Sequence, residues 1–301
     1  MSNSSTTAES KYKGIYQVLA RYKKLVEDKM RVCLDEMNGV AALKEAIEYS
    51  LVSNGKRFRP IIVFMMAKAL GKGFDVTPSA LAVEFFHTAS LVADDLPCMD
   101  DEEFRREKPT LHTIFGEAKS LLVTYSLIAT GYGFISKNGS LIPLEDSNER
   151  CLLALDNASK NTGASGAAGG QFLDLFPQER SLNALKEMLR LKTVTLFEVA
   201  FIFGWLFGGG DLSLIENVKK IADHWGHAFQ IADDFSDFHQ DEGRFVNIVQ
   251  EMGPEGAYNL FNGHIQSLKE CFKTLPIDSS EFLEMVSSLE QSAQEQMNSM
   301  A

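Results

Sequence analysis

The sequence predicts an all-α fold, and three observations support this prediction. Apolar residues recur at spacings of three and four through most of the 301-residue chain, as they do on one face of an α-helix. No stretch alternates apolar and polar residues between turn signals in the way that β-strands do. No internal repeat of fixed period stands out, so a solenoid of short repeats is not expected. We therefore expect a bundle of about ten helices or more.

Helical periodicity divides the chain into segments that glycine, proline and asparagine separate. The segments are residues 12–50, 55–70, 77–95, 117–137, 148–162, 182–207 and 211–237, with two further helices in 251–297. Gly71-Lys72-Gly73 ends the second segment, and Asn138-Gly139 predicts a turn after the fourth. Residues 194–207 are the most membrane-like stretch, but they carry Glu198 and are too few to span a bilayer. We expect them to form a buried core helix.

No polar linker divides the chain, so we expect one domain over residues 11–301. Residues 1–10 are polar, and we interpret them as a disordered tail. They have no apolar core, so they are not a secretory signal, and they are too short and acidic for a transit peptide. The four cysteines lie far apart and form no CxxC pair, which favours a reduced, cytoplasmic location.

The charge balance excludes one class of partner and constrains another. A net charge of −12 argues against nucleic-acid binding, which needs a basic stripe. An anionic substrate would need a metal ion and a local cluster of lysine and arginine to overcome the overall field. The functional site should therefore combine acidic and basic clusters.

The first acidic cluster ends the apolar segment 77–95 and contains Asp94, Asp95 and Asp100. Buried anions cost several kcal/mol unless something compensates them. Pro97 cannot continue a hydrogen-bonded helix, so we expect the backbone to open there and to return Asp100 toward the other two. The alternative is a solvated, acidic helix end.

The second acidic cluster, Asp233-Asp234-Phe235-Ser236-Asp237, ends another apolar helical segment. Its three aspartates are spaced by three and four residues, which places them on one helix face, and Gln230 shares that face. Like charges so placed repel one another unless a cation lies between them. Oxygen-only ligands indicate Mg²⁺ shared with substrate phosphates. The alternate-residue spacing of an EF-hand calcium loop is absent.

Basic residues flank these clusters. Gly55-Lys56-Arg57-Phe58-Arg59-Pro60 precedes a helix and is either an anion site or a solvated turn. Phe104-Arg105-Arg106-Glu107-Lys108 follows the first acidic cluster. His87 lies two turns before Asp94, where a structural role and a phosphate-binding role are both open. Lys192 lies in an apolar segment and needs an anionic partner there.

Taken together, these motifs resemble those of the trans-isoprenyl diphosphate synthases, the family that includes farnesyl and geranylgeranyl diphosphate synthases. The resemblance spans residues 50 to 256 and is carried by Gly55–Pro60, Asp94–Asp100, Arg105-Arg106, Lys108-Pro109-Thr110, Gly169-Gly170-Gln171, Lys192-Thr193 and Phe229-Gln230 before Asp233–Asp237. It implies an isoprenoid-synthase-like helical bundle, with a central cavity between facing Asp-rich helices, and a homodimer.

The resemblance also implies an activity. A prenyltransferase of this kind condenses isopentenyl diphosphate with an allylic diphosphate by Mg²⁺-assisted ionisation, condensation and proton elimination. The residues that it implies are Asp94, Asp95, Asp100, Asp233, Asp234 and Asp237 for Mg²⁺; Arg105 and Lys192 for the allylic diphosphate; Thr193 and Gln230 near the developing cation; and Lys56, Arg59, His87 and Arg106 for isopentenyl diphosphate.

The chain departs from the family pattern at four places. Thr124-Tyr125 replaces a Gly-Asp pair, and Glu107 replaces a usual glycine. A lysine is missing after the second cluster, where Arg244 lies one position away before Phe245. Val194 follows Lys192-Thr193 where a small residue is usual.

Product length in this family depends on side chains that precede the first cluster on its helix. Ala89, five residues before Asp94, is small, while Phe85 and Phe86 lie a turn deeper and could form a floor or only fill the core. We expect geranylgeranyl diphosphate as the product, with farnesyl diphosphate as the second candidate. The alternatives are a non-catalytic regulatory subunit of a heteromeric synthase and a terpene cyclase. The retained isopentenyl-site residues argue against the cyclase.

Overall fold

The structure is a computed structural model that describes residues 5–52, 55–239 and 246–300. Its elements, in chain order, are α1 (Ser5–Glu36), α2 (Ala41–Leu51), α3 (Phe58–Leu70), α4 (Thr77–Asp94), β1 (Phe104–Arg105), β2 (Lys108–Pro109), α5 (Leu111–Phe115), α6 (Glu117–Leu141), α7 (Ser147–Thr162), α8 (Ala167–Leu175), α9 (Leu182–Leu189), η1 (Arg190–Val194), α10 (Thr195–Phe207), η2 (Leu212–Leu214), α11 (Ile215–Ser236), α12 (Ile248–Met252), α13 (Pro254–Lys273) and α14 (Ser280–Met300). The predicted all-α class is confirmed. In the described part of the chain, the one sheet is the short antiparallel pair β1–β2.

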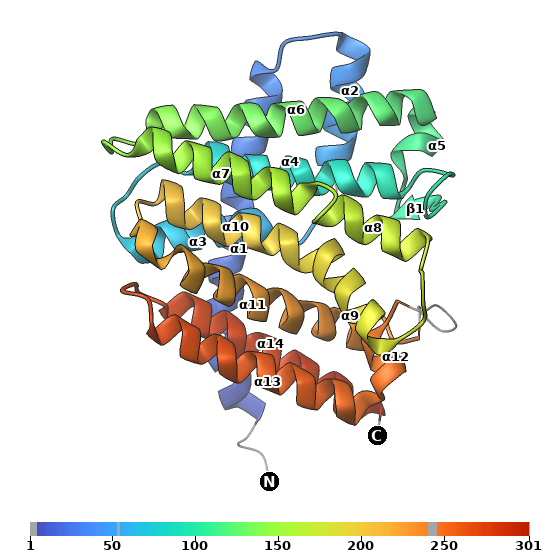
Figure 1. Ribbon diagram of the computed structural model, residues 1–301, viewed down its shortest axis with the longest axis vertical. Coiled ribbons are helices and arrows are strands. Elements are labelled where there is room, and N and C mark those ends of the chain that lie inside the picture. The colour runs from blue at the N-terminus through green and yellow to red at the C-terminus, as the bar shows by residue number, and fades with distance from the viewer. Residues whose placement is uncertain (1–4, 53–54, 240–245, 301) are drawn as a thin grey trace.

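Most helices stack across the long axis of the molecule, with α6 and α7 near one end and α13 and α14 at the other (Figure 1). Helix α1 crosses behind this stack and packs against α3, α4 and α14. No helix in the described ranges is both long enough and apolar enough to cross a membrane.

Helix α10 is the centre of the core, as residues 194–207 were expected to be. Every residue of α10 except Glu198 is buried, and its neighbours include α3, α4, α7 and α11. Asn157 and Asn161 of α7 donate hydrogen bonds to Glu198 Oε1 at 2.7 and 3.0 Å. Because these amides solvate the carboxylate, a glutamate is tolerated on an otherwise apolar helix.

The periodicity located the helices well but missed several interruptions. Residues 12–50 form two helices, because the Asn38-Gly39 turn, with Gly39 at φ 145°, separates them. Helix α1 begins at Ser5, so its backbone extends into the stretch that was expected to be a tail. The extent of a single domain over 11–301 stays a prediction.

The turn predicted at Asn138-Gly139 is wrong, because α6 continues to Leu141. The Asn138 side chain accepts a hydrogen bond from Ser79 N at 2.9 Å and donates one to Asp75 O at 2.9 Å. Gly139 lies so close to Cys151 of α7 that an added Cβ would be 2.8 Å from the Cys151 Cβ. These contacts with α4 and α7 override the local turn preference of the pair.

Candidate functional site

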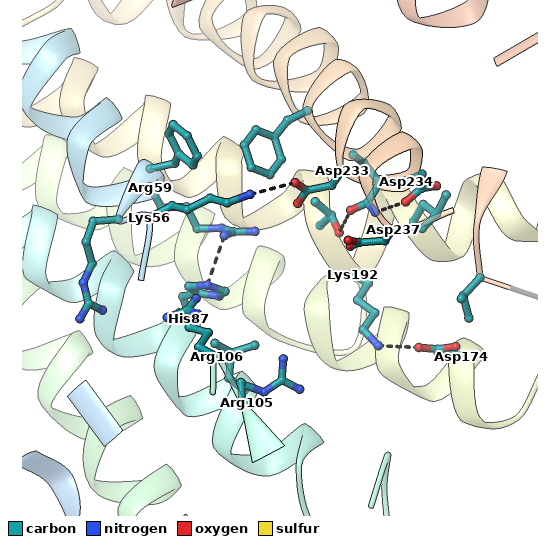
Figure 2. A pocket seen from close by; sticks show the side chains of 18 of the residues that line it. Lys56, Arg59, His87, Arg105, Arg106, Asp174, Lys192, Asp233, Asp234 and Asp237 are labelled. Carbon is teal, nitrogen blue, oxygen red and sulfur yellow. Dashed lines mark hydrogen bonds and ion pairs between the residues drawn. The ribbon is translucent and has the colours of Figure 1, made fainter. Parts of the chain in front are cut away.

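A cavity of about 590 Å³ lies between α3, α4, the β1–β2 hairpin, η1 and α11. It gathers most of the predicted site residues (Figure 2). Those that line it are Lys56, Arg59, His87, Arg105, Arg106, Lys192, Thr193, Gln230, Asp233, Asp234 and Asp237. Side chains from opposite halves of the sequence thus face one space, and we call it the charged cavity.

Arg59 and His87 form the basic wall of the charged cavity. Arg59 Nη1 lies 3.3 Å from His87 Nε2, and its guanidinium packs 4.5 Å from the centroid of the Phe197 ring. Burial lowers the pKa of Arg59 to about 10, so the side chain stays charged at neutral pH. Burial, followed by the charge of Arg59, lowers the pKa of His87 well below its usual value. The imidazole is therefore neutral.

The neutral His87 ring has one defined tautomer. Because a guanidinium can only donate, His87 Nε2 accepts from Arg59, and the proton of the ring lies on Nδ1. His87 Nδ1 and Arg59 Nε are both buried with no hydrogen-bonding partner among the described residues. Buried donors without partners are costly, so this wall is suited to an anion that would accept from them.

Arg57 has a different task from its basic neighbours. Its side chain is buried, forms an ion pair with Glu84 and donates a hydrogen bond to Leu51 O at 2.6 Å. The backbone of Arg57 is left-handed, with φ 57°, which turns the chain sharply into α3. Glu84 was not predicted as a site residue. The signal for it was an acidic residue within the apolar run of α4, one turn before His87.

In the second acidic cluster, the three aspartates differ in their surroundings. Asp233 is half-buried and lies 3.3 Å from Lys56 Nζ. Asp234 is buried and accepts hydrogen bonds from Gln230 Nε2 at 2.6 Å and from Ile248 N at 2.8 Å. The Thr193 hydroxyl donates to Gln230 Oε1 at 2.7 Å, so Asp234 fixes the amide that orients Thr193. Asp237 is exposed at the end of α11.

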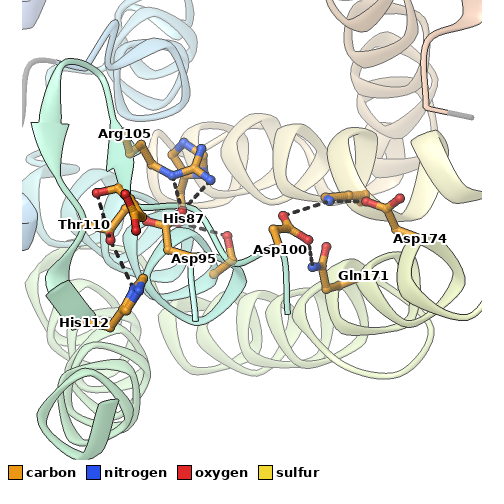
Figure 3. A network of polar contacts seen from close by, with 11 residues as sticks. His87, Asp95, Asp100, Arg105, Thr110, His112, Gln171 and Asp174 are labelled. Atoms are coloured by element: carbon orange, nitrogen blue, oxygen red, sulfur yellow. Dashed lines mark hydrogen bonds and ion pairs between the residues drawn. The ribbon is translucent and has the colours of Figure 1, made fainter. Parts of the chain in front are cut away.

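The first acidic cluster lies beside the charged cavity and is joined to it by polar contacts (Figure 3). Asp95 is buried and accepts a hydrogen bond from Arg105 Nε at 2.5 Å. After Pro97 the backbone returns as predicted, with Asp100 N donating to Asp94 O at 2.9 Å. Burial raises the pKa of Asp94 to about 7, although Lys192 opposes the shift. Negative charge at Asp94 is therefore undercompensated.

Lys192 links the two parts of the site. It lies in η1, a single π-helical turn within the segment 182–207, where one uninterrupted α-helix was predicted. Its Nζ lies 2.5 Å from Asp174 of α8 and 4.0 Å from Asp100. Gly170 permits this approach, since a Cβ there would lie 2.3 Å from Lys192 N. Such π-turns frequently occur at functional sites.

Asp174 was also missed in the sequence. Its signal is the spacing of three residues that separates it from Gln171, which places both on one face of α8. Gln171 Nε2 donates to Asp100 at 2.9 Å, while Asp174 pairs with Lys192. Helix α8 thus supports both the first acidic cluster and the lysine.

A second cavity, of about 620 Å³ and mostly apolar, shares Lys192 with the charged cavity. It extends along α4, α6 and α8 and is lined by Phe86, Ala89, Ser90, Ala93, Asp94, Thr124, Ile128, Thr162, Phe172 and Phe176, among others. We call it the apolar cavity. An amphipathic ligand with a charged head near Lys192 would have room for an apolar tail here.

Comparisons with known proteins agree with this geometry. The sequence model of the Polyprenyl synthetase family matches residues 40–250. The chain is 32% identical to the farnesyl diphosphate synthase of Bacillus subtilis over 285 residues, 89% of this chain and 94% of that protein. It is 37% identical to geranylgeranyl pyrophosphate synthase 11 of Arabidopsis thaliana over 65% of this chain and 56% of that protein. The chain belongs to the polyprenyl synthetase family.

The fold comparison supports the same assignment. A geranyltransferase from Legionella pneumophila superposes with a TM-score of 0.82 over 94% of this chain and 99% of that one, at 24% identity. The isoprenoid-synthase-like fold is therefore confirmed. As a member of the polyprenyl synthetase family, the chain is a prenyltransferase of the farnesyl and geranylgeranyl synthase type.

The structure gives a local setting for two of the departures from the family pattern, Val194 and Glu107. Val194 is buried against α11, where a Cβ on Gly226 would be 2.9 Å from Val194 Cα, so a glycine opposite makes room for the larger residue. Glu107 and Arg106 have φ 65° and φ 53° at the tip of the β1–β2 hairpin, a backbone that favours glycine. Arg244 and Phe245 lie outside the described residues.

Proposed function

We propose that this chain condenses isopentenyl diphosphate with an allylic diphosphate, head to tail, and that geranylgeranyl diphosphate is its main product. The observation that carries this proposal is the junction of the charged and apolar cavities at Lys192. A prenyl diphosphate has the same division, with a dianionic or trianionic head and a hydrocarbon tail. The bacterial and plant relatives named for farnesyl and geranylgeranyl synthesis support the same reaction class.

The carboxylates fit Mg²⁺ as the metal of this site. All the candidate ligands are hard oxygen donors, and the raised pKa of Asp94 indicates excess negative charge that a cation would offset. No three groups among the described residues could hold a metal ion on their own. Mg²⁺ usually binds through one or two carboxylates and completes its shell with substrate phosphates and water. The residues that would hold it are Asp94, Asp95, Asp100, Asp233, Asp234 and Asp237.

Bound Mg²⁺ would supply Lewis acidity that stabilises the departing diphosphate. The chain's own cations would act on the same group, with Arg105 and Lys192 holding the allylic diphosphate. Lys192 has its ammonium between Asp174 and Asp100, so it can shift toward the diphosphate with little loss of charge compensation.

The pair Thr193 and Gln230 would lie next to the allylic cation that ionisation leaves. Thr193 donates its proton to Gln230 Oε1, so the lone pairs of Thr193 Oγ1 remain for a positive charge. Asp234 and the Ile248 amide hold Gln230 in this orientation. A preorganised oxygen dipole stabilises developing charge without reorganisation during the reaction.

The second substrate would bind the opposite wall. Lys56, Arg59, His87 and Arg106 offer cationic and N–H donors to the diphosphate of isopentenyl diphosphate. Its double bond would then attack the allylic cation across the charged cavity. The departing diphosphate would accept the final proton, because His87 is already a proton donor at Nδ1 and the aspartates would be occupied by metal.

The apolar cavity supports the longer product. Phe86 lines this cavity beyond the small residues Ala89 and Ala93. Phe85 is fully buried and packs edge-on against Phe134, 5.2 Å between ring centroids, so it fills the core as the alternative interpretation expected. Because Phe86 is the first large side chain of α4 below Asp94 in this cavity, the longer geranylgeranyl product is favoured over farnesyl diphosphate.

One assay tests the proposal. Purified protein is incubated with Mg²⁺, isopentenyl diphosphate and each allylic diphosphate in turn, and product lengths are identified by mass spectrometry. We expect condensation that stops at geranylgeranyl diphosphate. Absence of condensation with every starter would instead support the non-catalytic subunit. A change in the product of a partner synthase when this chain is added to it would establish that role.

We also propose a homodimer through α6. Several large apolar side chains on this helix are between 39 and 64% exposed, namely Leu121, Leu122, Tyr125 and Ile128. Apolar side chains clustered on one face indicate an interaction surface. Light scattering should give twice the monomer mass, and Leu122→Asp should reduce it to the monomer. A monomeric wild-type chain would contradict the proposal.

A further inference from the structure

On α4, Phe86 is the residue lining the apolar cavity that lies farthest from Asp94. From Asp94 back along α4, the cavity is lined by Ala93, Ser90 and Ala89, and then by Phe86. Phe86 precedes Asp94 by eight residues, which is about 12 Å along the helix axis. Phe86 is therefore the first large residue that a tail would meet on this face of α4.

The position of the Phe86 ring depends on a glycine of the neighbouring helix. A Cβ added at Gly131 of α6 would lie 2.6 Å from Phe86 Cε1 and 3.0 Å from Cζ. These distances are below any van der Waals contact, so only glycine lets the ring lie back against α6. A glycine inside a helix costs about 0.5–1 kcal/mol relative to alanine, and this clearance is the structural reason for it.

A second residue of α6 supports the ring from its edge. Tyr132 packs against Phe86 with the ring centroids 5.1 Å apart and the planes at 62°. Thr162 Oγ1 donates to Ala158 O at 2.8 Å, so its lone pairs accept from Tyr132 OH, 3.2 Å away. Tyr132 is thus anchored to the end of α7, and Thr162 itself lines the apolar cavity.

We propose that Gly131 and Tyr132 are specificity-determining positioning residues that set product length by holding Phe86 back as the floor of the apolar cavity. This inference rests on the proposed function, in which the cavity holds the growing prenyl tail. Neither residue lines the cavity, and both act through Phe86. The depth of the cavity is therefore a property of the α4–α6 packing as well as of the α4 sequence.

The chain offers a matched pair of variants. Gly131 and Gly133 lie two residues apart in α6, but a Cβ at Gly133 meets no atom within 4 Å. Gly131→Ala should push the Phe86 ring toward the cavity and favour the shorter product. We expect the farnesyl-to-geranylgeranyl ratio to rise roughly tenfold, the change that about 1.4 kcal/mol in competing barriers produces. Gly133→Ala should leave the ratio unchanged.

Two further variants separate positioning from misfolding. Adding Phe86→Leu to Gly131→Ala removes the ring edge that clashes and should return the longer product. Tyr132→Phe keeps the ring but loses the hydrogen bond to Thr162, and should give a smaller change in the same ratio. Circular dichroism melts confirm that each variant is folded. A folded Gly131→Ala variant with the wild-type product ratio would overturn the inference.

Binding without turnover distinguishes this inference from the proposed function. Calorimetry with farnesyl and geranylgeranyl diphosphates and Mg²⁺ measures the affinity for each ligand, which depends on the cavity depth whether or not the chain condenses substrates. Gly131→Ala should weaken the longer ligand more than the shorter one, and Gly133→Ala should not. An inactive wild-type chain with this binding pattern would refute the proposed function alone. Equal effects on both ligands would refute the role of Gly131 in positioning Phe86 as the limit of the cavity.

Discussion

In both acidic clusters the second aspartate of the Asp-Asp pair is bonded to protein donors, but the first aspartates differ in their electrostatic surroundings. In each Asp-Asp pair, the second carboxylate is buried and bonded to protein: Asp95 to Arg105, and Asp234 to Gln230 and the Ile248 amide. Asp94 borders the apolar cavity, while Asp233 and Asp234 both line the charged cavity. Thus the second aspartate of each pair also organises the site through its bonds to protein donors.

The first carboxylates of the two pairs, Asp94 and Asp233, differ in their surroundings. Asp233 has the ammonium of Lys56 at 3.3 Å, so its charge is compensated within the protein. Asp94 borders the apolar cavity, and burial raises its pKa to about 7. If metal binds here as proposed, the first cluster should depend on the bound cation more than the second does, although the two motifs are similar in sequence.

The largest effect should follow from Asp94→Asn. If Asp94 holds metal, the variant should lose roughly 10²–10³-fold in turnover, the loss typical of removing one group that stabilises charge in the transition state. Its fold should be kept, because the amide removes a poorly compensated charge. Steady-state rates and thermal melts measure both effects.

The control for this variant is Asp101→Asn, an exposed neighbour with φ 55°, which asparagine tolerates well. It should retain turnover within a small factor. Equal losses in the two variants would mean that general charge near the site matters, and that the position of Asp94 does not.

Asp234→Asn tests whether the buried carboxylate of the second cluster organises the site. Both carboxylate oxygens of Asp234 accept from donors, and an amide can present only one oxygen to them. One buried donor would then face an NH₂ group, at a cost of about 1–3 kcal/mol in the free energy of unfolding. Denaturant titration measures it. Stability equal to that of the wild type would show that Asp234 has no organising role.

The pH dependence of stability should separate the two clusters in the metal-free protein. The pKa of Asp94 is about 7 in the folded chain and 3.8 in the reference state, so the folded state binds the proton more tightly. Its contribution to stability is therefore largest below pH 4, declines as the pH rises toward 7, and is constant above.

This decline can be isolated by comparison with Asp94→Asn, which lacks the titrating group. The difference in melting temperature between variant and wild type should grow between pH 4 and 7 and should shrink when Mg²⁺ is added. A difference independent of pH across this range would show that Asp94 is not the carboxylate with the raised pKa.

Much of the fold and of the site could be predicted from the sequence. The helical periodicity located α3, α4, α10 and α11, and the acidic motifs fall at the ends of α4 and α11 as expected. These predictions succeed because they depend on local spacing. A helix that ends in carboxylates can be recognised without knowledge of its neighbours.

The remainder depends on contacts between residues distant in sequence. The sequence places Arg57 in the basic segment Gly55–Pro60 without fixing its role, and only the packing of α3 on α4 pairs it with Glu84. Phe85 and Phe86 are adjacent in sequence, yet one fills the core and the other lines a cavity. The π-turn that carries Lys192 has the composition of an ordinary helix, so no local signal marks it.

The smallest effect concerns the hairpin that holds Arg105 against Asp95. Glu107 has φ 65° at the hairpin tip, and a left-handed backbone costs a non-glycine residue about 1–2 kcal/mol. Glu107→Gly removes this strain but makes the unfolded chain more flexible, so we expect a net gain below about 1 kcal/mol. Glu107→Asn should give part of the gain. Denaturant midpoints measure both, and a loss of stability in Glu107→Gly would mean that the Glu107 side chain supports the hairpin more than its backbone strains it.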